Sequence, residues 1–274
     1  MSKIKQTIQL GTVQETLLIP LWARAMETSR PDAIIRDPLS AQILEQIDYD
    51  FSKLAQAQST QVGVCLRGVM FDEWVKDFLR QNPSGAVIEV GAGLNTRFER
   101  VDNGRANWIE VDLPDAIKLR QQFFGESDHR KILSGSLLDS EWMEQVRTQY
   151  SGPFLIVIEA VLMYLTEVEV KQAFALLSKY FAGSLVAFDS LAPMSLKSQD
   201  KHDSMRHFSA RFQWAIQNVK EIQRWDPSYK VIQVKTFWES PAQHRRRLAP
   251  WWIRFLYACP PFRNAYRLAL IRLT

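Results

Sequence analysis

The sequence predicts an α/β protein whose doubly wound, mostly parallel sheet carries helices on both faces. Between Gly85 and Asp189, short apolar runs alternate with helical segments, as expected for strands joined by crossover helices. Phe154–Ile158 is a near-continuous apolar run, typical of a strand buried on both faces. We therefore expect one domain with a helical cap in residues 1–84, a core in residues 85–190 and a C-terminal region in residues 191–274.

Length and composition are those of a globular protein. A chain of 274 residues can keep a single hydrophobic core. Hydrophobic residues make up 46% and charged residues 23%, which excludes a disordered chain. The net charge is +4, and seven arginines but no acid lie between His244 and Thr274, so residues 1–243 carry −3. A mildly acidic body is thus followed by a basic, aromatic segment.

Several protein classes are excluded. Two cysteines, Cys65 and Cys259, cannot build a disulfide framework, and neither belongs to a Cys-x-x-Cys pair. Met1–Leu10 is polar, so we expect no secretory signal, and no stretch reaches the ~18–20 apolar residues of a membrane span. These features predict a reducing, cytoplasmic location. The four histidines lack metal-ligand spacing, so no metal is expected.

The cap is predicted to be helical. An apolar stripe runs through its first helix, which Pro20 should bend or restart. The pair Asp37-Pro38 is a helix-start signal, with an acidic cap before a proline at the first helical position. These signals predict helices at Glu15–Thr28, Leu39–Ile47 and Thr60–Arg80.

The core is predicted to alternate strands with helices. Pro114 opens one helix, and the capping box Thr166–Glu169 opens another through Phe181. The strands are expected at Ala86–Val90, Asn107–Val111, Lys131–Leu133, Phe154–Ile158 and Leu185–Phe188.

The C-terminal region is less regular. Phe262, Tyr266 and Leu270 fall on one helical face, and Tyr229–Phe237 alternates like a half-buried strand. We expect helices at His202–Arg224, Trp251–Tyr257 and Phe262–Leu273.

A glycine motif marks the first candidate site. Gly91 and Gly93 follow a strand, where their lack of side chains lets a ligand approach the backbone. Glu110 and Asp112 come 19 and 21 residues after Gly91, where an acid commonly accepts hydrogen bonds from ribose hydroxyls. Thr96 replaces the third glycine of a dinucleotide fingerprint. The pattern therefore favours an adenosine ligand without a pyrophosphate, and an ordinary strand-to-helix turn is the alternative.

Four motifs, in order over about residues 12–190, resemble the leucine carboxyl methyltransferase family. That family includes bacterial O-methyltransferases of aromatic polyketide synthesis. The resemblance implies a class I methyltransferase fold and S-adenosylmethionine as the cofactor. The motifs are Ala23–Glu27 with Asp37-Pro38, Gly91–Arg97, Glu110–Pro114 and Glu159–Leu165.

The resemblance also implies roles for particular residues. Arg67 would pair with the methionine carboxylate of the cofactor, which a guanidinium can bind through two parallel hydrogen bonds. Asp112, rather than Glu110, would bind the ribose hydroxyls, and Glu159 would approach the ammonium or sulfonium end. The segment Gly91, Ala92, Gly93 would lie along the methionine and ribose portion.

The remaining roles concern adenine and the acceptor. Ser136 and Leu137 stand where the family usually has Asp-Leu against adenine. Tyr164 is a candidate to hydrogen-bond the acceptor, with a packed core position as the alternative. Asn95 replaces a common Asp, and Leu138 stands where members that methylate a peptide carboxyl terminus have Arg.

The resemblance implies an S-adenosylmethionine-dependent O-methyltransferase, and we expect it to act on a small aromatic or carboxylic metabolite. Methylation of a protein or peptide carboxyl group and a catalytically silent cofactor-binding protein are the alternatives. A carboxylate acceptor needs no base, whereas a phenol would need one. His202 and His207 are candidate bases, each with a surface or capping role as the alternative, so no catalytic residue is identified.

The basic, aromatic segment has three interpretations. It could form helices packed on the body, wall a hydrophobic or acidic substrate site, or contact an anionic membrane surface. Nucleic acid is not expected as a partner, because the chain lacks a recognition motif. The oligomeric state is not predicted.

Overall fold

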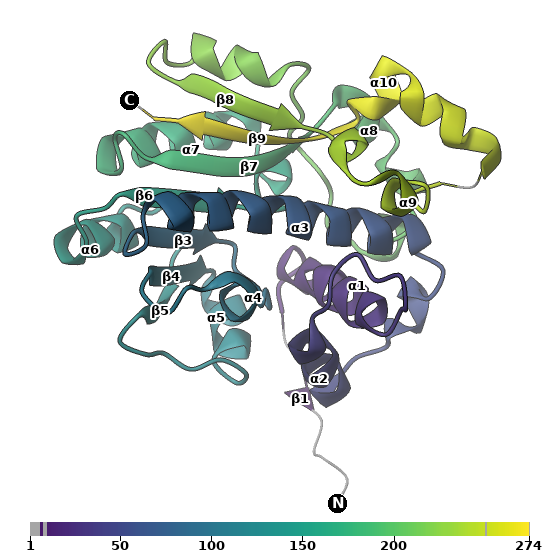
Figure 1. The fold of residues 1–274 in the computed structure, drawn as a ribbon, viewed down its shortest axis with the longest axis horizontal. Helices are drawn as coiled ribbons and strands as arrows, with labels where there is room; N and C mark the ends of the chain where they lie inside the picture. Colours follow the sequence, from purple (N-terminus) through teal and green to yellow (C-terminus); the bar gives the residue numbers. More distant parts are fainter. Residues whose placement is uncertain (1–5, 8–9, 250, 274) are drawn as a thin grey trace, which may run out of the picture.

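The protein is built on a seven-stranded sheet in the order β5-β4-β3-β6-β7-β9-β8 (Figure 1). The computed structural model describes residues 6–7, 10–249 and 251–273. Neighbouring strands from β5 to β7 are parallel, whereas β9 is antiparallel to both β7 and β8. The strands are β3 Ala86–Val90, β4 Asn107–Asp112, β5 Arg130–Ser134, β6 Phe154–Ile158, β7 Leu185–Leu191, β8 Lys230–Lys235 and β9 Tyr266–Arg272, and a short parallel pair joins β1 Gln6–Thr7 to β2 Ile47–Asp48.

Helices cover both faces of the sheet. The α-helices are α1 Leu18–Thr28, α2 Pro38–Gln46, α3 Gln58–Gln81, α4 Arg97–Val101, α5 Pro114–Arg120, α6 Glu141–Gln149, α7 Glu167–Tyr180, α8 Pro193–Lys197, α9 Ala242–Arg245 and α10 Pro260–Arg263. The 3-10 helices are Gln14–Leu17, Phe51–Leu54, Leu162–Tyr164, Gln199–Lys201, Met205–His207, Val219–Arg224, Phe237–Glu239 and Trp251–Ala258. The capping box predicted at Thr166 and Glu169 is present at the start of α7.

The side chains of β3, β4, β6, β7 and β9 alternate between two hydrophobic cores. On one face, Val87 and Trp108 pack with Phe71 and Trp74 of α3, the long helix that crosses the sheet (Figure 1). On the other face, Ile88 packs in the core that α6 and α7 cover. The helices α1 and α2 lie against each other at the end of the sheet where α3 begins (Figure 1). The predicted α/β architecture, a mostly parallel sheet with helices on both faces, is therefore confirmed.

The predicted helix His202–Arg224 is wrong. The structure has only two short 3-10 helices within it, at Met205–His207 and Val219–Arg224. Between them the backbone bonds to the core rather than to itself, since Gln213 N–H donates to the Met163 carbonyl and Ile216 N–H to the Leu191 carbonyl. The apolar spacing reflects side chains buried at separate points along an extended segment.

The predicted helix Phe262–Leu273 is also wrong. The short helix α10 ends at Arg263, and Tyr266–Arg272 forms the strand β9 between β7 and β8. Both long edges of β9 are hydrogen-bonded, so the sheet satisfies its backbone groups and its apolar side chains are buried on both faces.

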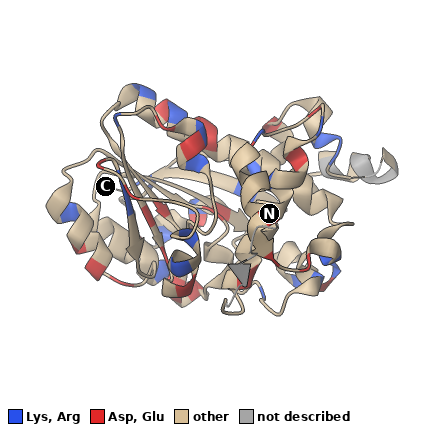
Figure 2. Cartoon of the chain, turned by 90° about the horizontal axis from the view of Figure 1, so that it is seen from below, with Lys and Arg blue, Asp and Glu red and all other residues tan. Residues whose placement is uncertain are grey.

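The acidic and basic parts of the sequence do not form separate acidic and basic regions in the folded protein. Basic and acidic residues are interspersed over the molecule (Figure 2). Arg247 pairs with the buried Glu27 of α1, and the Arg267 guanidinium donates to the carbonyls of Ile216 and Gln217. Part of the C-terminal charge thus holds the fold together. No helix among the described residues is both long and apolar enough to span a membrane, and these residues contain no cluster of potential metal ligands.

Candidate cofactor and acceptor site

A cavity of about 860 Å³ opens where the parallel strands end. This volume lies toward the upper end of the ~300–1,000 Å³ usual for ligand sites. The carboxyl ends of parallel strands meet at one edge of a sheet, which is where α/β proteins bind their ligands. The strand ends β3 to β7 contribute Gly91, Leu113, Gly135, Glu159 and Leu191.

All nine residues predicted for the cofactor and acceptor line this cavity. They are Arg67, Gly91, Ala92, Gly93, Asp112, Ser136, Leu137, Glu159 and Tyr164. Of the two candidate bases, His202 is among the lining residues and His207 is not.

The glycine loop has a backbone that requires glycine. Gly91 has φ +73°, and a Cβ there would lie 2.2 Å from Cγ2 of Val161. Gly93 has φ +47°, also in the left-handed region. Larger residues at these positions would strain the loop and, at Gly91, collide with the segment that follows β6.

Two buried arginines hold the loop by its carbonyl groups. Arg120 Nη1 donates to the carbonyls of Gly93 (2.7 Å) and Asn95 (3.0 Å), and Arg24 Nη2 donates to that of Leu94 (2.8 Å). The other nitrogens of Arg120 bond Glu110, which is fully buried. Glu110 therefore supports the loop through Arg120 and is not among the residues that line the cavity.

Asp112 closes the loop on the cavity side. Its carboxylate accepts hydrogen bonds from the backbone N–H groups of Gly93 (2.6 Å) and Leu113 (2.7 Å). Burial raises the pKa of this carboxyl despite those hydrogen bonds. Each oxygen can still accept a further hydrogen bond, because a carboxylate oxygen has two lone pairs.

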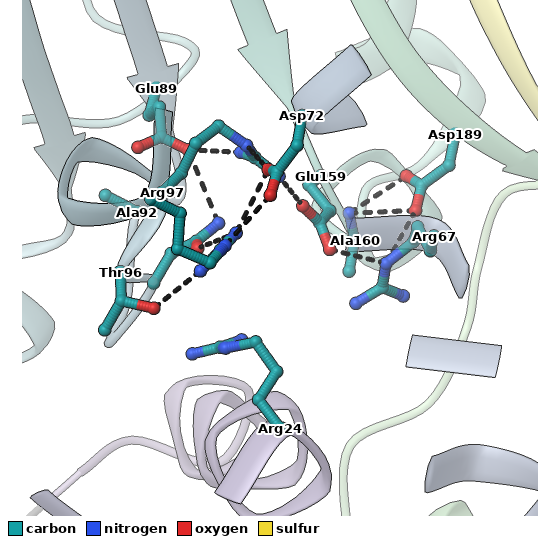
Figure 3. A network of polar contacts seen from close by, with 12 residues as sticks. Arg24, Arg67, Asp72, Glu89, Ala92, Thr96, Arg97, Glu159, Ala160 and Asp189 are labelled. Carbon is teal, nitrogen blue, oxygen red and sulfur yellow. Dashed lines mark hydrogen bonds and ion pairs between the residues drawn. The ribbon is translucent and has the colours of Figure 1, made fainter. Parts of the chain in front are cut away.

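A network of buried ion pairs connects the cap to the sheet (Figure 3). Arg97 is fully buried, and it donates to Asp72 on α3 (2.7 Å), to Glu89 on β3 and to Glu159 after β6 (2.5 Å). Toward the cap, Arg24 pairs with Asp37 at 2.8 Å. Buried charges need such partners because an uncompensated one is costly.

Glu159 links this network to the cavity. Its Oε1 accepts from Arg67 Nε at 2.7 Å, so one carboxylate bridges Arg67 and Arg97. Burial would raise the pKa of Glu159, but the two guanidiniums outweigh burial and lower the pKa to about 2.

This depressed pKa predicts a pH-dependent contribution to stability. The contribution is fully present above pH 4.5, the ordinary pKa of Glu159, and is lost as the pH falls toward about 2. We expect Glu159→Gln to be less stable than wild type at about pH 7 and the difference in unfolding free energy to shrink by about pH 3. Urea denaturation at both pH values measures this, with Glu167→Gln on the exposed surface of α7 as the control. A constant difference would contradict it.

The adenine and acceptor candidates differ in their surroundings. Leu137 is buried, while the Ser136 hydroxyl accepts a hydrogen bond from the Leu138 N–H. The Tyr164 ring packs against Phe212 at 5.4 Å, and burial raises the pKa of its hydroxyl to about 12. Tyr164 thus has features of both its predicted roles, because it is packed and also borders the cavity.

Sequence reasoning missed several residues that build the site. Arg24, Asp72 and Arg120 received no role, nor did Asp189, which is fully buried, or Tyr266. One usable signal was an acidic residue inside or at the end of an apolar strand, because a buried acid requires a buried partner. Glu89, Glu110 and Asp189 all show that signal.

The sequence matches a known family and known methyltransferases. Residues 18–178 match the model of the leucine carboxyl methyltransferase family. The chain is 29% identical over 265 residues to the tetracenomycin polyketide synthesis O-methyltransferase TcmP of Streptomyces glaucescens, covering 96% of this chain and 97% of that protein. It is 28% identical over 247 residues to the S-adenosyl-L-methionine-dependent methyltransferase dpfgK of Gibberella zeae, covering 82% and 83%.

Solved structures show the same fold. A solved structure from Thermobifida fusca superposes with a TM-score of 0.58 at 15% identity, covering 92% of this chain and 94% of that one. A DUF574 family protein from Streptomyces avermitilis has the same TM-score at 12% identity, covering 92% and 97%.

Proposed function

The chain belongs to the leucine carboxyl methyltransferase family and is an S-adenosylmethionine-dependent methyltransferase, and we propose that its acceptor is an oxygen of a small aromatic metabolite bearing an anionic group. One observation carries the proposal. The same cavity that holds the glycine loop and Asp112 is walled elsewhere by aromatic rings and basic side chains. A cofactor and a small acceptor could therefore meet inside it.

The residues at the strand ends fit S-adenosylmethionine. The backbone at Gly91 leaves no room for a side chain, and Asp112 keeps acceptor capacity toward the cavity. Nη2 of Arg67 has no hydrogen-bond partner among the described residues, so it is available to a carboxylate. We infer that Arg67 holds the methionine carboxylate, Asp112 the ribose, Ser136 and Leu137 the adenine, and Glu159 the ammonium end.

The other side of the cavity fits an aromatic, anionic acceptor. Besides Tyr164 and Tyr266, four aromatic side chains line the cavity, and so do four cationic side chains from the C-terminal half, which together would attract a planar anion. This composition favours the wall interpretation of the basic segment. The aromatic residues are Phe212, Phe237, Trp238 and Phe262, and the cations are Lys201, Arg245, Arg246 and Arg263.

For this reaction the protein mainly has to align the acceptor oxygen with the methyl group of the cofactor. S-adenosylmethionine supplies an electrophilic methyl group on a sulfonium, and displacement requires the acceptor oxygen in line with it. Arg67 and Asp112 would fix one partner, while the aromatic wall would orient the other and exclude water. An anionic oxygen is already nucleophilic, so the proposal requires no general base.

Methyl transfer to a panel of acceptors tests the proposal. We expect turnover of aromatic carboxylic acids or acidic phenols and none of their uncharged methyl esters or ethers. Transfer to a peptide carboxyl terminus instead would favour the protein-methylating alternative. Calorimetric binding of S-adenosylmethionine without turnover of any acceptor would favour a silent binding protein.

Asp112→Ala should weaken binding of S-adenosylmethionine by ~1–3 kcal/mol, because the ribose would lose its hydrogen-bond acceptor. Isothermal titration calorimetry measures the change. Asp115→Ala, on the same helix-start segment, is the control, since its carboxylate bonds Gly11 and lies outside the cavity lining. An unchanged affinity in the Asp112 variant would contradict the assignment.

Contact with an anionic membrane remains a separate prediction. Trp251 is 78% exposed and Phe255 is 66% exposed, so both rings are accessible to a lipid surface.

A further inference from the structure

A buried cluster joins the strand β9 to the cofactor end of the cavity. The hydroxyl of Tyr266, the first residue of β9, accepts a hydrogen bond from Arg67 Nη1 at 3.0 Å and donates one to Asp189. Asp189 is fully buried on β7 and lies 3.8 Å from Arg67 Nε. The backbone N–H of Ala160 also donates to Asp189, at 2.9 and 3.1 Å to its two oxygens (Figure 3).

The contacts of Arg67 leave one nitrogen free. Nε bonds Glu159 at 2.7 Å and Nη1 bonds Tyr266. Because a guanidinium is planar, fixing two of its nitrogens fixes the direction of the third. Nη2 is the nitrogen without a partner among the described residues, and Arg67 lines the cavity.

Tyr266 is suited to hold Arg67 in position rather than to act as a general base. Burial raises the pKa of its hydroxyl far above the usual value, and Asp189 adds to the shift, so the hydroxyl stays protonated and keeps donating to Asp189. Its ring is held as well, because it stacks on Phe237 with centroids 5.2 Å apart and planes 13° apart.

We propose that Tyr266 is a positioning residue for cofactor binding, which acts by orienting Arg67 toward the carboxylate of S-adenosylmethionine. The inference rests on the proposed function, since it takes that carboxylate to be the ligand of Arg67. Tyr266 lies well beyond residues 18–178, the part of the chain that matches the family model. The cofactor site therefore depends on a strand outside the matched segment.

Tyr266→Phe keeps the ring and removes only the hydroxyl. We expect it to raise the Kd for S-adenosylmethionine about tenfold, the size of a lost hydrogen bond to a charged group. The KM for the cofactor should rise in parallel, while kcat and the KM for the acceptor stay near wild type. Tyr229→Phe is the matched control, because its buried hydroxyl bonds Ser178 on the opposite face of the sheet.

A double-mutant cycle decides whether Tyr266 acts through Arg67. In the Arg67→Met background, Tyr266→Phe should cause no further loss of cofactor affinity. If the two losses multiply, or if the acceptor KM or the pH profile of kcat changes while cofactor Kd does not, the proposal is overturned. Wild-type affinity in Arg67→Met would instead show that the assignment of Arg67 under the proposed function fails.

Folding is checked by thermal melting. If Tyr266→Phe does not fold, the double variant Tyr266→Phe/Asp189→Asn removes the carboxylate charge left without its hydroxyl partner. We expect the same tenfold loss of cofactor affinity in that variant. Wild-type affinity there would overturn the proposal.

Discussion

Arg97→Met should lower the free energy of unfolding by at least ~3–5 kcal/mol, the cost of breaking a buried ion pair by removing one partner. Arg97 is fully buried and compensates Asp72, Glu89 and Glu159 together. Its loss would leave Glu89 with only hydrogen bonds from Trp108 and Asn95. Urea denaturation measures the change.

Arg80→Met is the control for the loss of one positive charge. Its side chain is 73% exposed and pairs only with Asp77, so the expected change in stability is within about 1 kcal/mol. Arg97→Lys should fall between wild type and Arg97→Met, because an ammonium keeps the charge without the three-way fork. Equal stability of Arg97→Met and wild type would show that the network is dispensable.

Arg247→Met should lower the free energy of unfolding by ~3–5 kcal/mol, because it leaves the buried carboxylate of Glu27 without its cationic partner. The Arg247 guanidinium bonds both oxygens of Glu27, at 2.8 and 2.7 Å, and Glu27 is fully buried on α1. The adjacent carbonyl of Leu248 accepts from Ser59 on α3. The two contacts fasten the segment around α9 to the cap, so the variant should also loosen the cavity wall.

Arg246→Met is a closely matched control. It removes the neighbouring arginine, which is exposed, and should change the free energy of unfolding by no more than ~0.5 kcal/mol. Thermal and urea denaturation of both variants give the comparison. Limited proteolysis should cut the Arg247 variant first between α9 and Trp251, and cutting at the same rate as wild type would argue against the fastening role.

The parallel part of the sheet could be predicted because each of its strands can be recognised from its own short stretch of sequence. Phe154–Ile158 has no polar residue, and Gly91 follows its strand directly. The carboxyl ends of parallel strands lie at the same edge of a sheet. The shared position of Asp112 and Glu159 in one cavity could therefore be predicted without knowing how the side chains pack.

The C-terminal half could not be predicted in the same way. In Tyr266–Arg272, apolar residues suit a helical face as well as a strand, and only the free edges of β7 and β8 decide between them. The role of Glu110 was equally hidden. Its spacing suits a ribose ligand, but the buried Arg120 and Arg130 both require an anion, and Glu110 supplies it.

The position of β9 in the sheet determines when the sheet can be completed during synthesis of the chain. β8 has no neighbour in the sheet until Tyr266–Arg272 has been made, because β9 lies between it and β7. A ribosome-bound chain stopped before residue 266 would expose the edge of β7 and lack the hydroxyl that meets Arg67. Such a chain presents an open strand edge to chaperones or to other nascent chains, and it would gain its full sheet in one late step.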